Sequence, residues 1–238
     1  MSVYMVEVVN AVKQFRETKA LKNVTVRFEK GCIHGIIGRN GSGKTVLFKC
    51  ICGFMQLTSG SILVDGKPVK PAAAQDIGII IEDPGFIGSL SGFKNLKLLA
   101  SIRRVIASED IRDSLRRVGL DPDSKKPVSK YSLGMRHRLA IAQAIMERPK
   151  LLILDEPMNG LDKLGVLEIR ELLRALNREG TTILMSSHYA EDIEALCDTV
   201  YEMDGGILTC IRKAPLADKH QQDMGGVEQE PAASGTGT

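Results

Sequence analysis

The sequence predicts an α/β fold with a parallel sheet, and three observations point to it. Short apolar strands alternate with helical segments, which is the arrangement of a parallel sheet joined by crossover helices. One apolar strand, residues 33–37, runs into a glycine cluster followed by a potential helix, and another, residues 151–154, ends in two acidic residues. A chain of 238 residues is long enough for one large domain or a closely coupled pair.

The first part of the chain is expected to form strands on either side of the glycine cluster. In residues 24–28 three apolar side chains alternate with polar ones, which is the period of a half-buried strand. The helix after the glycine cluster is expected at residues 44–52. Residues 61–64 run into an Asp-Gly dipeptide, a hairpin signal, and residues 77–81 are expected to form a further buried strand.

From there to about residue 148 the chain is expected to be helical. Ser108 is placed to cap a helix whose apolar residues Ile111, Leu115 and Val118 share one face. Strands are expected again at residues 151–154 and 181–186, with a leucine-rich helix between them. The pattern divides the chain into residues 1–85, with the N-terminal strands and the first part of the core; residues 86–148, a helical insert; residues 149–213, the second part of the core; and residues 214–238, a tail rich in Gly, Gln and small polar residues that is expected to be disordered.

Composition excludes several classes of protein. Charged residues make up 26% and hydrophobic residues 43% of the chain, near the values of ordinary soluble globular domains. No run approaches the ~18 consecutive apolar residues of a membrane span, and we expect no secretory signal at the N-terminus. The five cysteines lack zinc-type spacing, so we expect buried free thiols in a reducing compartment. A net charge of +3 without a basic stripe does not indicate nucleic-acid binding.

Residues 38–45 read Gly-Arg-Asn-Gly-Ser-Gly-Lys-Thr, the phosphate-loop pattern of a glycine, four residues and Gly-Lys-Thr. Backbone N–H groups must wrap around a β-phosphate, which requires glycine conformations and no Cβ in the way. Lys44 would supply positive charge to the β- and γ-oxygens, and the Thr45 hydroxyl suits a Mg²⁺ ligand. A glycine-rich turn with an incidental lysine is the alternative interpretation. The expected nucleotide ligands are Gly38, Arg39, Asn40, Gly41, Ser42, Gly43, Lys44, Thr45 and Val46.

Asp155 and Glu156 directly follow the apolar strand at residues 151–154. In an open α/β sheet ligands sit beyond the carboxyl ends of the strands, so both residues are expected on the edge that carries the phosphate loop. Asp155 is suited to hold the shell of Mg²⁺, and Glu156 to polarise an attacking water as a general base. The alternative is a strand-end turn whose acids only face solvent.

With these motifs the chain resembles the nucleotide-binding subunit of an ABC transporter over about residues 3–213. The family's signature segment matches residues 131–135, which read Tyr-Ser-Leu-Gly-Met. The resemblance implies a P-loop NTPase of the ABC ATPase type, with a RecA-like parallel core sheet, an N-terminal antiparallel β subdomain and an inserted α-helical subdomain. It also implies ATP and Mg²⁺ as cofactors.

The resemblance assigns roles to further residues. Ser132 and Gly134 would contact the γ-phosphate bound by the opposite subunit, although Ser132 taken alone is typical of a helix N-cap. His188 matches the switch histidine that contacts the γ-phosphate, and a structural histidine is the alternative. Phe15 stands where an aromatic ring stacks on adenine, and a core position is the alternative for it. The expected catalytic residues are Glu156, His188 and Lys44.

Two positions depart from the family's pattern. Glu82 follows the strand at residues 77–81, where the family normally has a glutamine. A carboxylate can still bind Mg²⁺, but it adds negative charge near the phosphates. Met135 replaces the glutamine that usually ends the signature. The expected Mg²⁺ ligands are Thr45, Asp155 and Glu82. With Glu82 and the segment Tyr-Ser-Leu-Gly-Met, the chain is similar to exporter ATPases of the bacitracin and lantibiotic-immunity type.

The function implied by the resemblance is ATP hydrolysis that energises export through a separate integral-membrane permease, with a peptide antibiotic or another amphipathic compound as the cargo class. Two copies, or one copy and a second ATPase subunit, would sandwich ATP, and no nucleic acid is expected as a partner. The subunit would be cytoplasmic and peripheral on the inner face of the cell membrane. The alternatives are a non-transport ABC-type ATPase that acts as an ATP-switched clamp in DNA repair or on ribosomes, and a soluble P-loop kinase or GTPase.

Overall fold

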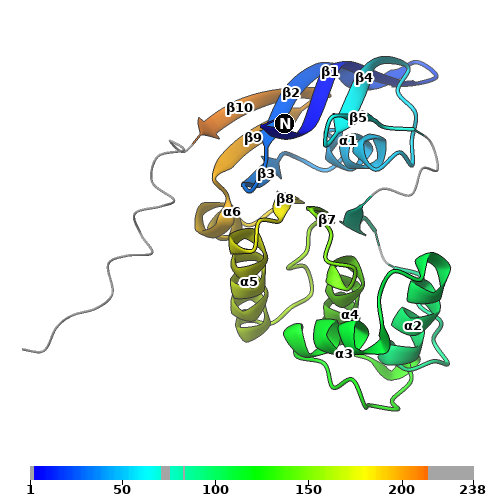
Figure 1. Ribbon diagram of the computed structural model, residues 1–238. Helices are drawn as coiled ribbons and strands as arrows, with labels where there is room; N and C mark the ends of the chain where they lie inside the picture. Colours follow the sequence, from blue (N-terminus) through cyan, green and yellow to red (C-terminus); the bar gives the residue numbers. More distant parts are fainter. Residues whose placement is uncertain (1–2, 71–75, 83, 214–238) are drawn as a thin grey trace, which may run out of the picture.

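The computed structural model describes residues 3–70, 76–82 and 84–213. They form two sheets with helices packed between and beneath them (Figure 1). The predicted tail, residues 214–238, lies outside the described residues. Among the residues that are described, no helix is both long enough and apolar enough to cross a lipid bilayer.

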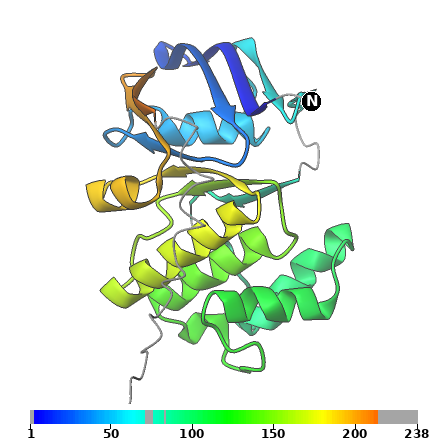
Figure 2. The same cartoon turned by 60° about the vertical axis from the view of Figure 1, so that its left-hand side comes forward.

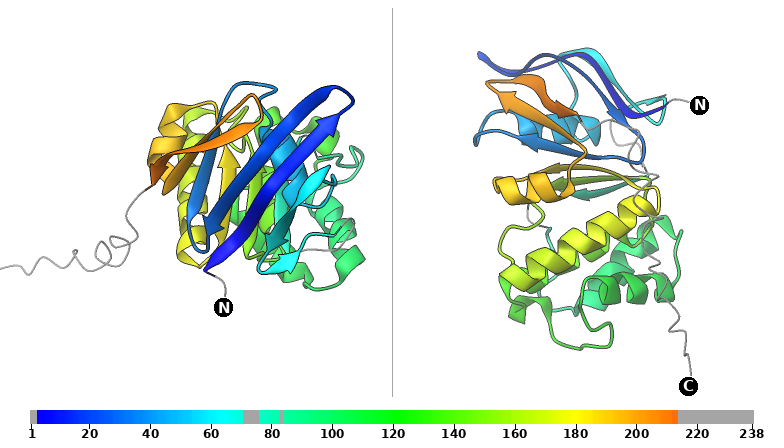
Figure 3. Two further views of the ribbon diagram at one scale, coloured as in Figure 1. Left: turned by 90° about the horizontal axis from the view of Figure 1, so that it is seen from above. Right: turned by 90° about the vertical axis from the view of Figure 1, so that its left-hand side faces the viewer.

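A four-stranded antiparallel sheet in the order β2-β1-β4-β5 forms the upper layer of Figure 1. β1 and β2 make a long hairpin, which Figure 3 shows from above. One face of the sheet is buried, because Val6, Val8 and Phe28 point into the core beneath it. The strands are β1 (Tyr4–Phe15), β2 (Thr18–Glu29), β4 (Ser59–Val64) and β5 (Lys67–Pro68).

The central sheet has six strands in the order β10-β9-β3-β8-β7-β6. Every neighbouring pair is parallel except β9 and β10. Parallel strands bring their carboxyl ends to one edge, so the segments that follow β3, β6, β7 and β8 meet there. The strands are β3 (Ile33–Ile37), β6 (Ile77–Ile80), β7 (Leu151–Asp155), β8 (Thr182–Ser186), β9 (Thr199–Asp204) and β10 (Ile207–Lys213).

Helix α1 (Lys44–Ile51) lies between the two sheets. Its residues Leu47 and Phe48 are fully buried in the same cluster as Val8 of β1 and Ile153 of β7. Burial of apolar surface stabilises by roughly 25 cal/mol per Å², so packing on both sides holds this helix firmly. The loop that precedes α1 is therefore attached to a rigidly packed helix.

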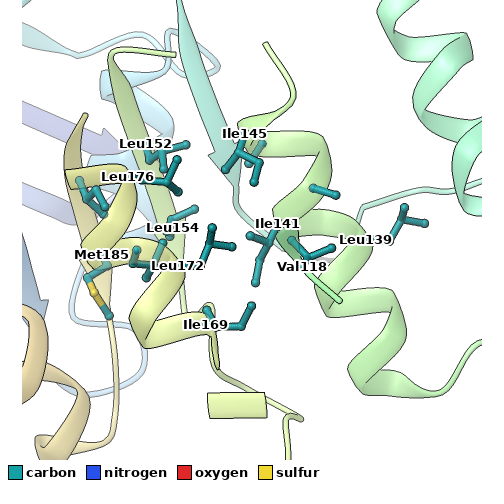
Figure 4. Packing of buried hydrophobic residues seen from close by; sticks show 14 of the residues in the cluster. Val118, Leu139, Ile141, Ile145, Leu152, Leu154, Ile169, Leu172, Leu176 and Met185 are labelled. Atoms are coloured by element: carbon teal, nitrogen blue, oxygen red, sulfur yellow. The ribbon is translucent and has the colours of Figure 1, made fainter. Parts of the chain in front are cut away.

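The other face of the central sheet is covered by α4 (Leu133–Ile145), α5 (Lys163–Arg178) and α6 (Ala190–Leu196), which lie below the sheet in Figure 2. β7 serves both cores, because its side chains alternate between the two faces. Leu151 and Ile153 join the cluster around α1, whereas Leu152 and Leu154 join the cluster around α4 and α5. Figure 4 shows the second cluster.

The helical insert between β6 and β7 contains α2 (Gly92–Arg103), α3 (Ser108–Arg117), a 3-10 helix (Val128–Lys130) and α4. The expectation that Ser108 caps α3 is wrong by one residue, because Ala107 occupies the cap position. The backbone N–H of Ala107 donates to the carboxylate of Asp110 at 2.9 Å, so an acid in the first turn supplies the cap.

The five cysteines are free thiols, and four of them are buried. Burial raises the pKa of Cys50 to about 11 and that of Cys197 to about 12, so these groups stay protonated at neutral pH. The expectation of buried thiols is wrong for Cys210, which lies exposed on the edge strand β10.

Candidate functional site

The loop between β3 and α1 depends on its glycines. Gly38, Gly41 and Gly43 have φ angles of 145°, 77° and 119°, which side-chain-bearing residues rarely adopt. A Cβ on Gly38 would lie 2.2 Å from the carbonyl oxygen of Met203. α1 begins directly after Gly43, so its first N–H groups point toward the loop. The bend therefore presents backbone donors that suit an anion.

Lys44 lies inside this loop. Its residue is only 6% exposed, and its Nζ donates to the carbonyl oxygens of Gly38 at 2.7 Å and Arg39 at 3.2 Å. The hydroxyl oxygen of Ser42, in the same loop, is buried without a hydrogen-bond partner among the described residues. Buried polar atoms usually have a hydrogen-bond partner, so this hydroxyl is free to donate to a bound group such as a phosphate oxygen.

A cavity of about 210 Å³ opens beside Lys44. It joins the loop after β3 with the ends of β7 and β8, as expected from the parallel sheet. Two of the predicted nucleotide ligands, Gly38 and Arg39, are not among the described residues that line the cavity, and their carbonyl oxygens accept hydrogen bonds from Lys44 instead. Ala20 of β2 does line the cavity, although the sequence did not predict it. The lining residues are Ala20, Asn40, Gly41, Ser42, Gly43, Lys44, Thr45, Val46, Asp155, Glu156 and His188.

Thr45 and Asp155 are in direct contact. The Thr45 hydroxyl donates to Oδ2 of Asp155 at 2.6 Å, and the Ser186 hydroxyl donates to Oδ1 at 2.5 Å. Mg²⁺ is commonly held by one or two carboxylates together with substrate phosphates and water, so this pair of oxygen donors fits that ion. Sequence reasoning missed Ser186, although it is the last residue of β8 and pairs in register with Asp155.

Glu156 and His188 face each other across the edge of the sheet. The backbone N–H of His188 donates to Oε2 of Glu156 at 3.1 Å, and the Nε2 of its ring lies 3.1 Å from Oε1. The backbone N–H of Glu156 donates to the hydroxyl of Ser186 at 3.0 Å. Glu156 itself has a positive φ of 54°, a strained conformation that turns its side chain after the strand end.

Burial raises the pKa of Glu156 above the ordinary value of a glutamate. The charge of His188, the N–H bond from its backbone and the charge of Lys44 oppose this shift, whereas the charge of Asp155 adds to it. A carboxylate with a raised pKa is a stronger base once it is ionised, which suits a group that must take a proton from water.

Ser132 and Gly134 occupy a different part of the chain. Ser132 is the N-cap of α4, and its hydroxyl accepts the backbone N–H of Met135 at 3.2 Å. Gly134 lies close to the loop after β7, since a Cβ on it would be 3.6 Å from the carbonyl oxygen of Gly160. Among the described residues that line the cavity at Lys44, neither of the two occurs.

Phe15 and Glu82 lie outside that cavity as well. Phe15 is 43% exposed at the end of β1, with the Nζ of Lys13 at 5.0 Å from the centre of its ring. Glu82, with a positive φ of 65°, has a 68% exposed side chain and lines a neighbouring cavity of about 620 Å³ that also contains Asp155 and Glu156. Its Oε1 lies 2.5 Å from the Nζ of Lys49, a partner that the sequence did not indicate.

Comparison with known proteins identifies close relatives. The family model described as ABC transporter matches residues 21–159. The chain is 42% identical over 211 residues to the uncharacterized ABC transporter ATP-binding protein YybJ of Bacillus subtilis (strain 168), a match that covers 88% of this chain and 97% of the relative. It is 39% identical to the bacitracin transport ATP-binding protein BcrA of Enterococcus faecalis, covering 92% and 72%. It is also 39% identical to the lantibiotic transport ATP-binding protein SrtF of Streptococcus pyogenes, covering 82% and 85%.

Solved structures confirm the predicted fold class. The dimeric post-hydrolysis state of the ATP-binding cassette MJ0796 bound to ADP and Pi superposes with a TM-score of 0.79 at 22% identity, over 87% of this chain and 99% of that one. The structure of cbiO1 from Clostridium perfringens, part of the ABC transporter complex cbiONQ, superposes with a TM-score of 0.76 at 31% identity, over 87% of both chains.

Proposed function

The chain belongs to the ABC transporter family as a subunit that binds and hydrolyses ATP, and we propose that the cavity at Lys44 is its catalytic site. One observation carries this proposal. The cavity collects a buried ammonium, an unpaired hydroxyl, a hydroxyl–carboxylate pair and a carboxylate–histidine pair from three separate loops. These are the groups that phosphoryl transfer to water requires.

Lys44 and the loop bind the phosphates. Lys44 exchanges the carbonyl oxygens of Gly38 and Arg39 for the β- and γ-oxygens of ATP, and Ser42 donates its unpaired hydroxyl. Thr45 and Asp155, whose side chains already meet, would hold Mg²⁺. When bound, Mg²⁺ neutralises charge on the phosphate oxygens. Phe15, which is 43% exposed at the end of β1, stacks on the adenine ring.

Glu156 orients the attacking water and accepts its proton. His188 contacts the γ-phosphate through its ring and steadies the carboxylate of Glu156 through its backbone N–H. Catalysis in such a site consists mainly of positioning and of stabilising charge in the transition state. The Nε2 of the His188 ring lies 3.1 Å from Oε1 of Glu156, and this contact supports the proposal that the two side chains act together.

A second copy of the subunit completes the site. Ser132 and Gly134, at the N-terminus of α4, contribute a hydroxyl and backbone donors to the γ-phosphate bound by the partner. A helix N-terminus carries partial positive charge and therefore suits this anion. Neither residue is among the described residues that line the cavity at Lys44, which is consistent with a contribution to the site of the facing subunit.

The membrane permease docks on a groove beside the central sheet. The groove has a volume of about 420 Å³ between β6, α2 and α4. Phe54 and Ile102 line it and are 66% and 76% exposed, so two large apolar side chains at one groove are available to a partner. A short amphipathic helix of the permease fits such a groove. The subunit would then lie on the inner face of the membrane without crossing it.

The relatives suggest the class of cargo. BcrA and SrtF are named for transport of bacitracin and of a lantibiotic, both peptide antibiotics. We propose that this subunit energises export of a peptide antibiotic or another amphipathic compound. The names of the relatives favour transport over an ATP-switched clamp in DNA repair or on ribosomes.

The test compares two variants of the full chain in magnesium buffer. Glu156→Gln keeps the hydrogen-bonding shape of the side chain but loses its basicity, so ATP is expected to drive it into a dimer that does not turn over. Lys44→Ala is expected to bind no ATP and to stay monomeric. Analytical ultracentrifugation with and without ATP, together with phosphate release, measures both properties. Turnover of Glu156→Gln at the wild-type rate would remove Glu156 from the role of base.

A further inference from the structure

We propose that Arg170, Asp192 and Ser187 form a buried brace that positions His188 for catalysis. The proposal rests on the role given to His188 above. None of the three residues lines the cavity at Lys44 among the residues that the structure describes, so they would act through the histidine and not on the nucleotide.

Asp192 is the centre of the brace. It lies in the first turn of α6 and is only 1% exposed. Its Oδ1 accepts two hydrogen bonds from Arg170 of α5, from Nε at 2.9 Å and from Nη2 at 2.6 Å. Charge-assisted hydrogen bonds of this kind are short and strong, so the two donors hold Oδ1 in place.

The second oxygen of Asp192 holds the segment that carries His188. The Ser187 hydroxyl donates to Oδ2 of Asp192 at 2.9 Å and accepts the backbone N–H of Tyr189 at 3.1 Å. The residues on both sides of His188 are therefore tied to one buried carboxylate. The backbone N–H of His188 itself donates to Glu156 on the opposite side. The segment that carries His188 is therefore held by Asp192 on one side and by Glu156 on the other.

Burial of the Asp192 charge costs free energy, and the ion pair that joins α5 to α6 does little more than offset this cost. A buried ion pair contributes little net stability, because the desolvation of both charges offsets their attraction. α5 and α6 already share a second link, in which Nη2 of Arg174 donates to the carbonyl oxygen of Ala195 at 3.0 Å. Of these two links, the Asp192 carboxylate is the one that also contacts the segment carrying His188, through the hydroxyl of Ser187, which points to a positioning role.

The position of His188 matters because phosphoryl transfer is sensitive to small displacements. A shift of about 1 Å in a catalytic group can cost on the order of 100-fold in rate. Loss of the brace releases the segment 187–189 without removing any group that touches the nucleotide. The expected result is a lower kcat with ATP affinity nearly unchanged.

The chain offers matched controls for this test. Glu191 is the neighbour of Asp192, is exposed, and approaches the same Nη2 of Arg170 at 3.8 Å. Glu191→Gln therefore makes the same chemical change beside the same arginine without touching Ser187. Arg174→Met breaks the other link between α5 and α6. Both controls are expected to keep the wild-type kcat.

A double-mutant cycle tests the brace. Asp192→Asn is expected to lower kcat roughly 10- to 100-fold in the wild-type background, with the dissociation constant of ATP changed by less than about 3-fold. In a His188→Ala background the same change is expected to have a much smaller effect, because the ring that it positions is absent and only the backbone N–H toward Glu156 remains. Radiolabelled ATP allows the residual rates to be measured. Ser187→Ala is the milder second variant, since it removes only the hydroxyl between Asp192 and the segment.

Each outcome decides a separate question. If Asp192→Asn lowers kcat by the same factor in both backgrounds, or if Glu191→Gln lowers kcat as much as Asp192→Asn does, the brace is overturned while the proposed catalytic site stands. Wild-type turnover in His188→Ala would overturn the proposed role of His188 and with it the brace. If Asp192→Asn does not fold, Ser187→Ala in the two backgrounds gives the same decision.

Discussion

The Nζ of Lys49 lies 2.5 Å from Oε1 of Glu82, so the unusual carboxylate after β6 is paired with a cation of the helix that follows the phosphate loop. Lys49 is one helical turn beyond Thr45, on the same face of α1. Glu82 brings a negative charge near the phosphate site, and Lys49 offsets it. The charges of Lys49 and Glu82 therefore compensate each other at the edge of the proposed nucleotide site.

Removing only Lys49 should weaken ATP binding. Lys49→Met leaves the charge of Glu82 without its partner beside the phosphates, and we expect the dissociation constant of ATP to rise roughly 2- to 5-fold at low ionic strength, less at high salt. Glu82→Gln in the same chain should restore the affinity. Calorimetric titration of the two single variants and the double variant measures this coupling. Additive effects in the double variant would show that the two charges do not act together.

The pKa of Glu156 should respond to its neighbours with predictable signs. Burial raises this pKa, while the positive charge and backbone N–H of His188 lower it. His188→Ala removes the ring charge and keeps the backbone N–H, so it should raise the pKa of Glu156 further. Asp155→Asn should lower this pKa, because a neighbouring negative charge is removed. Carbon NMR of labelled glutamate carboxyls, assigned with Glu156→Gln, follows the titration. A Glu156 pKa below the ordinary value of about 4.3 in the unmodified chain would contradict the structure.

The groove between β6, α2 and α4 should be needed for membrane association. Ile102 is 76% exposed and lines the groove, so Ile102→Asp adds a charge without disturbing the core. We expect this variant to keep its ATP affinity and to lose co-sedimentation with membranes that contain its permease. Leu164→Asp is the control, since Leu164 is 64% exposed on α5, away from the groove. Equal loss for both variants would argue against this docking site.

Gly78 should be indispensable for packing α4 against the central sheet. A Cβ at this position would lie 2.0 Å from the carbonyl oxygen of Ala144 in α4. Gly78→Ala must push the helix backbone away, and overpacking of this kind costs about 1–3 kcal/mol. Urea denaturation measures the loss of stability. Gly85→Ala is the control, because a Cβ there meets nothing within 4 Å, and equal stability of the two variants would refute the argument.

Much of the fold could be predicted from short stretches of sequence. The strand at residues 33–37 and the helix that begins at Lys44 lie where periodicity and the glycine pattern placed them. The N-cap of α3 was missed by one residue, because the carboxylate of Asp110 accepts the backbone N–H of Ala107 and the helix therefore includes Ser108. Local patterns report the period of a segment well and its ends less well, since several polar residues can satisfy the same N–H groups.

The glycine-rich loop before α1, the acids after β7 and the alternation of strands and helices could be predicted from residues that are adjacent in the chain. The contacts of Ser186 with Asp155, of Lys49 with Glu82 and of Arg170 with Asp192 emerge only in the folded protein. These contacts join residues far apart along the chain. Their formation depends on how the parallel sheet brings its loops to one edge and how the helices pack beneath it, which no local pattern encodes.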